Sequence, residues 1–341
     1  MEIRRLNTLR GLAALIVVIS HYSNAAGLWD KTLGSGAGYL GVMLFFLLSG
    51  FLMSYLNFGQ QPNTGNVRSF AVARIARVVP LFYVLTIASF ALSSLAPPPY
   101  NKALYNIDGV PSLLSHLLFL HGESVLWTIP PEIQFYALFA LAWIFHGRFG
   151  RNLYWPIALV WITDFFYGFN DETSTIAGLS FTPSITKALP YFITGSILGQ
   201  VYQHNKVPRD AMSNYYLLAL AFIPLLYPSI FFKVTGRYFA WWDTNVLIVL
   251  TAVFFAVVFL VPDKNILLEN TIGDFFGKVS YSLYLLHQPV LDVLERFKLP
   301  ESVFSLLLFI AMSTIAAYLS FIVIEAPSRN SIRRLFSKQT A

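Results

Sequence analysis

Arg10 and His21 are the first residues of the chain whose types and spacing could support chemistry. They lie eleven residues apart in a largely apolar stretch, and on a helix this spacing is about 16 Å of rise and three turns, with roughly 20° left over. Both side chains are therefore predicted on one helix face, with Arg10 near one end and His21 beyond the middle. The imidazole could transfer a proton and the guanidinium could bind an anion. A snorkelling arginine and a hydrogen-bonded core histidine would explain the pair equally well.

A second candidate site lies where Pro130 and Pro131 precede Glu132. Proline fits the first turn of a helix and fits its interior poorly. Glu132 is therefore predicted in a first turn, with Tyr136 on the same face. The helix dipole stabilises a carboxylate there, which is a sufficient structural explanation. In a functional site, the same carboxylate could orient a histidine or bind a hydroxyl group.

A third set of polar residues, Ser280, Tyr284 and His287, follows the i, i+4, i+7 pattern of one helix face. His287 would lie about 12 Å from the start of its span. A polar stripe of this kind can join helices by hydrogen bonds without any chemistry. The two hydroxyl groups fit that explanation, whereas for His287 both a structural and a functional role stay open.

Arg74 and Arg77 are three residues apart at the predicted start of another helix. The spacing places them on one side of the helix, where free N–H groups and the dipole favour an anion such as phosphate. Ordinary positive charge at the cytoplasmic end of a span would explain the two arginines as well.

The sequence predicts no metal site. It contains no cysteine, so disulfides and thiolate chemistry are excluded. His116 and His121 are five residues apart, a poor spacing for metal ligation. Asp164 lies deep in a predicted span without a partner that the sequence reveals, and its role stays open.

The elements that position these residues are predicted to be membrane-spanning helices. The chain of 341 residues is 56% hydrophobic and 12% charged, with a mean hydropathy of +0.60, whereas a soluble domain is about a quarter charged. This composition excludes a soluble Rossmann enzyme, a nucleic-acid-binding protein and a disordered chain. In a membrane protein, a net charge of +6 usually reflects Lys and Arg in the cytoplasmic loops rather than binding of an anionic partner.

The predicted fold class is an all-α membrane protein, a polytopic bundle of about ten transmembrane helices with the N- and C-termini in the cytoplasm. The bilayer core needs about twenty apolar residues per helix, and the basic loops fall on the inner side when the N-terminus is inside. The ten predicted spans are residues 9–26, 39–57, 78–95, 126–146, 153–169, 185–203, 215–232, 245–262, 279–296 and 302–325.

Two segments could change this topology. Ser112 to Leu120 is too short to span and is predicted as an outer half-helix. The first apolar run could be a signal peptide, with Arg4 and Arg5 as its basic region and Asn24-Ala25-Ala26 as its cleavage region. The distribution of basic residues favours the uncleaved topology.

Small residues in the predicted spans would allow helices to approach closely. They are Gly41, Ser49-Gly50-Phe51, Gly195 and Gly199.

The ordered set of these motifs resembles the integral-membrane acyltransferases of type 3 over essentially the whole chain. Arg10 to Ala14 with His21 is similar to the opening Arg-x10-His element of that family. The later motifs that carry the resemblance are Phe45 to Leu52, Arg74 to Pro80, Trp127 to Tyr136, Ser280 to His287, and Glu325 to Arg329. The fourth signature departs from the family pattern, because Thr128, Pro130-Pro131 and Ile133 replace Ser, Ser-Val and the second Glu. Only Glu132 of the acidic pair remains, which puts in doubt any mechanism that needs both carboxylates.

The resemblance implies transfer of a short acyl group, acetyl above all, from cytoplasmic acyl-CoA to a hydroxyl of a surface polysaccharide or a related glycan or lipid acceptor. It implies His21, Glu132 and His287 as catalytic residues, and Arg10, Arg74 and Arg77 as the residues that bind the coenzyme phosphates. Direct transfer and an acyl-His intermediate both stay open. The supporting residues are Ser49, Gly50, Tyr136, Tyr284 and Glu325.

The resemblance further implies one membrane domain over residues 1–341, without the soluble esterase-like domain that follows in some members. The implied location is a bacterial inner membrane, with no metal, no nucleic acid and an open oligomeric state. A proton-coupled transporter or flippase for a lipid-linked glycan or small solute is the alternative, because ionisable residues inside a bundle would serve transport too. No inverted repeat supports it. A structural scaffold is disfavoured, since each intramembrane ionisable residue costs about 3 kcal/mol on insertion.

Overall fold

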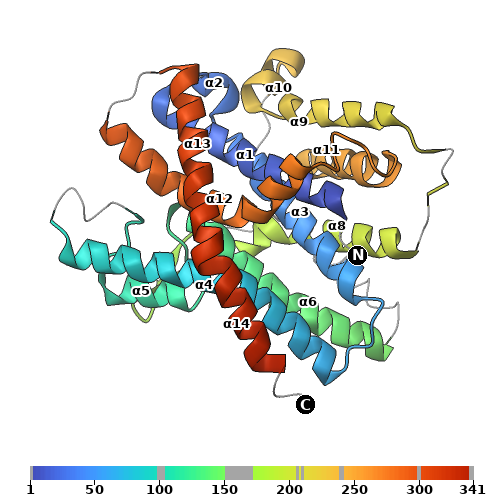
Figure 1. The fold of residues 1–341 in the computed structure, drawn as a ribbon, viewed down its shortest axis with the longest axis horizontal. Coiled ribbons are helices and arrows are strands. Elements are labelled where there is room, and N and C mark those ends of the chain that lie inside the picture. Colours follow the sequence, from blue (N-terminus) through green and yellow to red (C-terminus); the bar gives the residue numbers. More distant parts are fainter. Residues whose placement is uncertain are drawn as a thin grey trace.

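The chain is an all-α integral membrane protein, and its described residues add one small hairpin to the helices (Figure 1). The structure, a computed structural model, describes residues 3–97, 104–149, 172–204, 207–208, 211–237, 242–297 and 301–337. The helices of the first half are α1 (Arg4–Ala26), α2 (Asp30–Leu33), α3 (Gly38–Asn57), α4 (Thr64–Leu95), α5 (Gly109–Leu117), η2 (Ser124–Thr128) and α6 (Ile129–Phe149). Those of the second half are α8 (Ile185–His204), η5 (Asn214–Ala221), α9 (Phe222–Leu225), α10 (Pro228–Thr235), α11 (Thr244–Phe255), η6 (Ala256–Leu260), α12 (Thr271–Arg296), α13 (Val303–Ser320), η7 (Phe321–Glu325) and α14 (Ala326–Ser337).

Four helices of the described residues are long and apolar enough to cross a membrane, or five if one bent pair counts as a span. They cover the predicted spans 39–57, 78–95, 126–146 and 302–325. Helices α1, α8 and α12, and α11 with η6, occupy four more predicted places. The predicted span 153–169, which contains Asp164, lies outside the described residues.

The predicted span 215–232 is a broken segment rather than one straight helix. Residues Asn214–Leu225 and Pro228–Thr235 meet at an angle of 96°. The break follows from Pro228, because a residue that precedes proline is pushed out of the helical region, and Tyr227 is extended with φ −68° and ψ 132°. Figure 1 shows α9 and α10 at the edge of the bundle.

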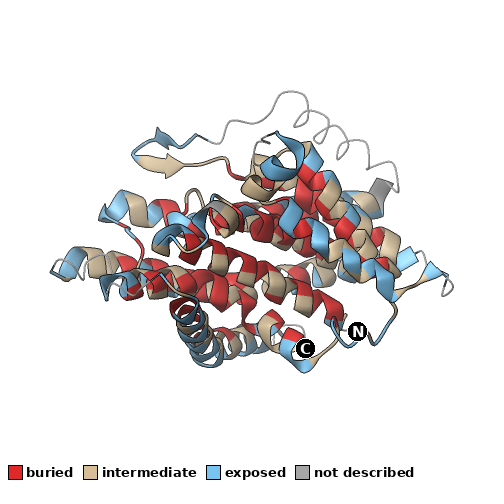
Figure 2. Ribbon diagram, turned by 90° about the horizontal axis from the view of Figure 1, so that it is seen from above, coloured by how far each residue is buried: buried red, intermediate tan, exposed pale blue. Residues whose placement is uncertain are grey.

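Two smaller elements lie outside the long helices. Helix α5 has nine residues, which confirms the prediction of a short helix near residues 112–120. Strands β1 (Ser174–Ile176) and β2 (Leu179–Phe181) form an antiparallel hairpin that the sequence prediction missed. Its two-residue turn has positive φ at both Ala177 and Gly178, as the twist of a tight hairpin requires. Figure 2 shows this hairpin projecting from the bundle.

Glycines set the close packing of the central helices, as the sequence predicted. A Cβ atom on Gly50 of α3 would collide with the carbonyl oxygen of Phe192 in α8, and a Cβ on Gly195 would collide with that of Leu47. Gly41 has the same relation to Ala13 of α1. Backbone contact of this kind is possible because glycine has no side chain at the point of contact.

Helix α1 forms part of the core and contacts both α3 and α12. Figure 2 shows buried residues concentrated in the central helices and exposed residues at the periphery. The N-terminal end of α1 is fixed by Arg5, which is 2% exposed. Its guanidinium donates to the carbonyl oxygens of Val258, Val261 and Pro262, at 2.8 to 3.2 Å. It also forms ion pairs with Asp263 and Glu269. These bonds satisfy the carbonyl groups that end η6.

Candidate active site

The structure brings His21 of α1 and His287 of α12 into direct contact. Nε2 of His287 lies 3.0 Å from Nδ1 of His21, and the ring centroids are 4.9 Å apart. Both residues were predicted as site residues, but 266 positions separate them, so only the fold reveals the pair. His287 is fully buried, and its Nδ1 lies 3.2 Å from the carbonyl oxygen of Leu283 in the preceding turn.

Pro289, two residues after His287 in α12, explains why a side chain from outside the helix donates to a backbone oxygen of α12. A proline in a helix removes the hydrogen bond to the carbonyl four residues earlier, which here belongs to Leu285. The hydroxyl of Tyr105 donates to this oxygen instead. The helix therefore stays intact where it carries its histidine.

Three neighbouring cavities run along the bundle between the arginines and His21. The inner cavity is lined by Arg10, Arg74 and Arg77, together with Asn7 and Tyr55. The middle cavity shares Arg10 and Arg77 with it. The outer cavity contains His21 and shares Val42 and Tyr284 with the middle one. Shared lining residues mean that the three cavities follow one another from Arg74 to His21.

Arg10 and His21 both line this series of cavities, as their common helix face predicts. Arg10 borders the inner and middle cavities, and His21 borders the outer one. Helix α1 is continuous between them from Arg4 to Ala26. Helix α1 thus places a cation and an imidazole at different points along this series of cavities.

Arg74 and Arg77 do not lie at a helix N-terminus, which corrects the prediction. Helix α4 begins at Thr64, three turns earlier, and the side chain of Asn63 accepts a hydrogen bond from the amide of Asn66 as its cap. The amide groups near the two arginines therefore belong to the interior of the helix, and no free N–H groups add to anion binding. Any anion site here depends on the guanidinium groups alone.

The guanidinium groups have capacity to bind an anion. Nε of Arg74 is buried and has no hydrogen-bond partner among the described residues. Arg77 and Arg74 both repel Arg10 electrostatically, and Glu132 is the carboxylate that attracts it. Three cations and one carboxylate give the region a net positive charge.

Glu132 lies in the first turn of α6, as predicted from the two prolines. The hydroxyl of Tyr136 donates to Oε1 of Glu132 at 2.5 Å, and Oγ of Ser49 donates to the same oxygen at 3.3 Å. Glu132, Ser49 and Tyr284 line the middle cavity. The hydrogen bonds of His21 come from His287 and Gln288 instead.

The remaining predicted residues support the helices around the cavities. Gly50 allows the contact with Phe192 described above. The hydroxyl of Tyr284 donates to the carbonyl oxygen of Val125 at 3.0 Å. Glu325 accepts a hydrogen bond from Ser282, whose hydroxyl also lies 3.1 Å from that of Ser320. These bonds join α12 to η2 and to the long helix of α13, η7 and α14, which crosses one face of the bundle in Figure 1.

Sequence reasoning missed an aromatic cluster beside the outer cavity. The rings of Trp127, Trp242 and Tyr39 lie 5.7 to 6.4 Å apart. Nζ of Lys187 lies 4.4 Å from the centroid of the Trp127 ring. Trp127 and Tyr39 line the outer cavity. Trp127 stands in a quoted motif, but nothing in the sequence indicated Trp242 as its neighbour.

Among the described residues, no group of three or more His, Cys, Asp or Glu side chains could hold a metal ion. The ionisable groups that border or adjoin the three cavities include an imidazole pair, one carboxylate and three guanidiniums. Such a set can bind an anion at one end and transfer a proton at the other.

The fold and this arrangement define a membrane-embedded transferase. A family model described as "Acyltransferase domain" matches residues 3–325, and the chain belongs to this acyltransferase family.

Curated relatives agree with this assignment. "Putative O-acetyltransferase SACOL0978" of Staphylococcus aureus (strain COL) is 23% identical over 355 aligned positions, which cover 95% of this chain and 57% of the relative. "Peptidoglycan O-acetyltransferase OatA" of Listeria monocytogenes serovar 1/2a is 24% identical over 361 positions, which cover 95% of this chain and 55% of the relative. The chain thus spans little more than half the length of these relatives. No solved structure matches the chain.

Proposed function

We propose that the protein is a membrane O-acetyltransferase that moves an acetyl group from cytoplasmic acetyl-CoA to a hydroxyl of a cell-surface glycan. The observation that carries this proposal is the series of three cavities from the arginines to His21. A long, thin donor with phosphates at one end and a thioester at the other matches a path with cations at one end and an imidazole at the other.

The chain is proposed to form one membrane domain that crosses a bacterial plasma membrane ten times, with both ends in the cytoplasm. The excess of Lys and Arg in the loops on that side supports this orientation. The inner cavity then opens toward the cytoplasm, where acetyl-CoA is present, and the outer cavity faces the acceptor.

Arg74, Arg77 and Arg10 would hold the donor's phosphates by charge-assisted hydrogen bonds. The buried Nε of Arg74, which has no partner among the described residues, supports this assignment. Glu132, held by Tyr136 and Ser49, would keep Arg10 in place beside the path. The donor contributes a carbonyl carbon that is activated as a thioester.

His21 would act as the general base. It would take the proton of the acceptor hydroxyl while the hydroxyl oxygen bonds to the carbonyl carbon. The carbon–sulfur bond then breaks, the sulfur leaves with the electron pair, and His21 returns the proton to it. His287 would orient His21 through the contact at 3.0 Å. The products are an acetyl ester and a free thiol, so atoms and charge balance.

A glycan of the peptidoglycan type is the first acceptor to test, because the relative from Listeria carries that name. The aromatic side chains of Trp127 and Tyr39 at the outer cavity offer apolar surfaces on which a sugar ring could stack. These surfaces support an acceptor with an apolar face and free hydroxyl groups.

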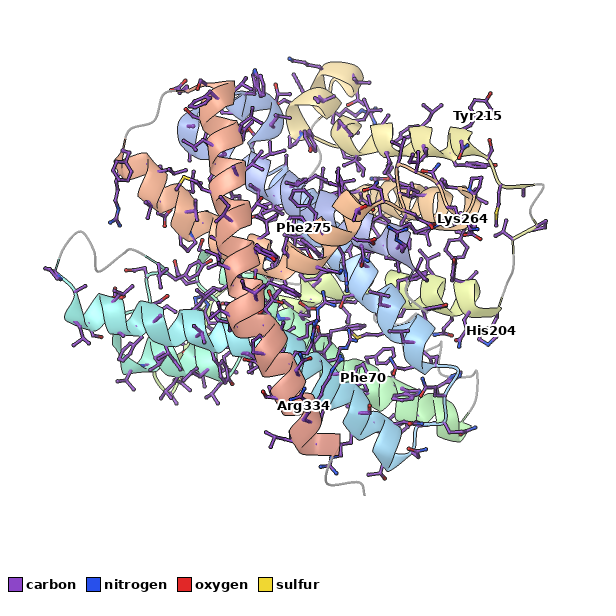
Figure 3. All side chains as sticks on the ribbon, in the orientation of Figure 1. Phe70, His204, Tyr215, Lys264, Phe275 and Arg334 are labelled. Atoms are coloured by element: carbon purple, nitrogen blue, oxygen red, sulfur yellow. The ribbon has the colours of Figure 1, made fainter. Side chains whose placement is uncertain are left out.

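Label transfer tests the proposal. The purified protein in lipid nanodiscs is mixed with acetyl-CoA labelled in the acetyl group and with soluble peptidoglycan fragments. The expected result is ester-linked label in the glycan that mild base releases. His204→Ala is the matched control and should transfer label as the wild type does. His204 is an exposed histidine at the end of α8, at the edge of the molecule in Figure 3. Two results together would instead identify a transporter. They are the absence of label transfer to any hydroxyl acceptor and the movement of a lipid-linked glycan across the membrane of proteoliposomes.

A further inference from the structure

Gln288 and Asp292 lie one turn apart on α12, next to His287, and the proposed mechanism does not use them. Nε2 of Gln288 donates to Oδ1 of Asp292 at 2.8 Å. A carboxylate oxygen only accepts hydrogen bonds, so the amide nitrogen must face Asp292. The amide oxygen then faces His21, and Oε1 lies 3.0 Å from its Nδ1.

The neighbours of the two imidazoles determine where their protons lie. The oxygen of Gln288 can only accept, so Nδ1 of His21 must carry a hydrogen. The carbonyl oxygen of Leu283 can only accept as well, so Nδ1 of His287 must carry a hydrogen. Nε2 of His287 is then a lone pair, and it shares the hydrogen on Nδ1 of His21.

The opposite arrangement would create two repulsive contacts. If Nε2 of His287 donated to His21, the lone pair on Nδ1 of His21 would face the oxygen of Gln288. The lone pair on Nδ1 of His287 would face the oxygen of Leu283 in the same way. One proton arrangement therefore satisfies every contact of the pair of neutral imidazoles, and it leaves Nε2 of His21 as a lone pair.

We propose that Gln288, held by Asp292, is a positioning residue that fixes His21 in the tautomer with the proton on Nδ1, so that Nε2 is the base. Among the described residues, Nε2 of His21 has no hydrogen-bond partner. His21 lines the outer cavity, where the acceptor hydroxyl would arrive. The catalytic consequence rests on the proposed acetyl transfer, whereas the tautomer itself does not.

Gln288 and His287 bias His21 toward the same tautomer. The oxygen of Leu283 leaves Nε2 of His287 as an acceptor for the hydrogen on Nδ1 of His21, and the oxygen of Gln288 is a second acceptor for that hydrogen. Replacing Gln288 by leucine removes one of the two acceptors, so the preference for this tautomer should weaken. In the other tautomer, Nε2 of His21 carries the hydrogen and cannot take a proton from the acceptor hydroxyl.

A charge-conserving swap makes the test specific. Gln288→Glu alone places two carboxylates side by side, and Asp292→Asn alone leaves the amide of Gln288 free to turn. The double variant Gln288→Glu with Asp292→Asn restores a donor and an acceptor between the two positions. A carboxylate oxygen still faces His21 in the double variant.

The first readout is nitrogen-15 NMR of histidine-labelled protein in nanodiscs, with the His21 signals assigned by their loss in His21→Ala. Wild-type protein should show a protonated Nδ1 and an unprotonated Nε2 at His21, and Gln288→Leu should show a mixture of the two tautomers. A protonated Nε2 in the wild type, or an unchanged tautomer in Gln288→Leu, would overturn the proposal. This readout needs no activity. A wild-type protein that transfers no acetyl group would therefore refute the proposed function but not the proposal on the tautomer.

The second readout is turnover. Gln288→Leu should lower kcat by about 10-fold, less than the usual 10²- to 10⁴-fold contribution of the whole general base, with the affinity for acetyl-CoA unchanged. The double variant should recover most of this loss, whereas each single change should not. Wild-type turnover in Gln288→Leu, or no recovery in a double variant that folds and binds acetyl-CoA, would contradict the positioning role.

Discussion

Arg74→Ala should weaken the binding of the donor and leave the chemical step nearly intact. The Nε atom of Arg74 is buried without a partner among the described residues, so a phosphate oxygen would gain a hydrogen bond that nothing in the free protein replaces. A hydrogen bond to a charged group contributes about 1.5 to 3 kcal/mol, which corresponds to a dissociation constant that rises about 10- to 150-fold. His21 lines a different cavity, so turnover at saturating donor should change little.

Calorimetry with coenzyme A and steady-state kinetics with acetyl-CoA measure the two effects. Arg74→Lys keeps the charge but loses the planar fork, so its affinity should fall between those of the wild type and Arg74→Ala. Arg237→Ala, an exposed arginine after α10, is the matched control and should leave the affinity unchanged. An unchanged affinity in Arg74→Ala with a large loss of turnover would refute the phosphate role.

Three further predictions concern the architecture. Gly50→Ala should lower the melting temperature in detergent because its Cβ collides with the backbone of α8, and overpacking of this kind costs about 1 to 3 kcal/mol. Gly65→Ala adds a Cβ that makes an ordinary van der Waals contact with Asn63 at 3.4 Å, so it should melt as the wild type does. Equal melting temperatures of the two variants would contradict the close approach. Arg5→Met should lower the free energy of unfolding by about 3 to 5 kcal/mol, since it leaves buried acceptors unpaired. An unfolding midpoint of Arg5→Met equal to that of the wild type would show that the bonds of Arg5 contribute nothing. Hydrogen bonds from Arg4 hold the pKa of Asp274 below its usual value, so the stability that this pair contributes is present at neutral pH and is lost as acid protonates the carboxylate. Asp274→Asn should therefore lose that part of the dependence of the melting temperature on acid pH. The same acid dependence in Asp274→Asn and the wild type would exclude the pair as a source.

Helical periodicity and proline position were sufficient to predict where several candidate residues lie. The spacing of Arg10 and His21 predicted a shared face, and both line the series of cavities. Pro130 and Pro131 predicted the first turn that holds Glu132. These features are local, because they depend on the geometry of one helix.

The errors arose where polar residues interrupt or extend a helix. Helix α4 continues through its polar segment to Thr64, which an apolar window cannot detect, although Asn63 was an available cap signal. Pro228 was an available signal for the break in the segment 214–235. The turn at Ala177 and Gly178 was a weaker signal, because alanine rarely adopts positive φ.

The contacts of His21 could not be predicted from helix geometry. The family resemblance implied His21 and His287 together as catalytic residues, but the direct contact between them and the contact with Gln288 join helices more than 260 residues apart in sequence. Single-sequence patterns carry no information on such contacts. The same applies to Trp242 beside Trp127. The sequence therefore identifies the groups that can react, and the tertiary structure identifies which of them act together.

The most direct test of the central claim, that His21 is the base at the end of the donor's path, is acetyl transfer by His21→Ala beside His204→Ala. Both variants should insert, fold and bind acetyl-CoA as the wild type does. The account predicts that His21→Ala loses about 10²- to 10⁴-fold in turnover, the usual contribution of general-base catalysis, while His204→Ala keeps full activity. Near-normal acetyl transfer by His21→Ala would contradict it.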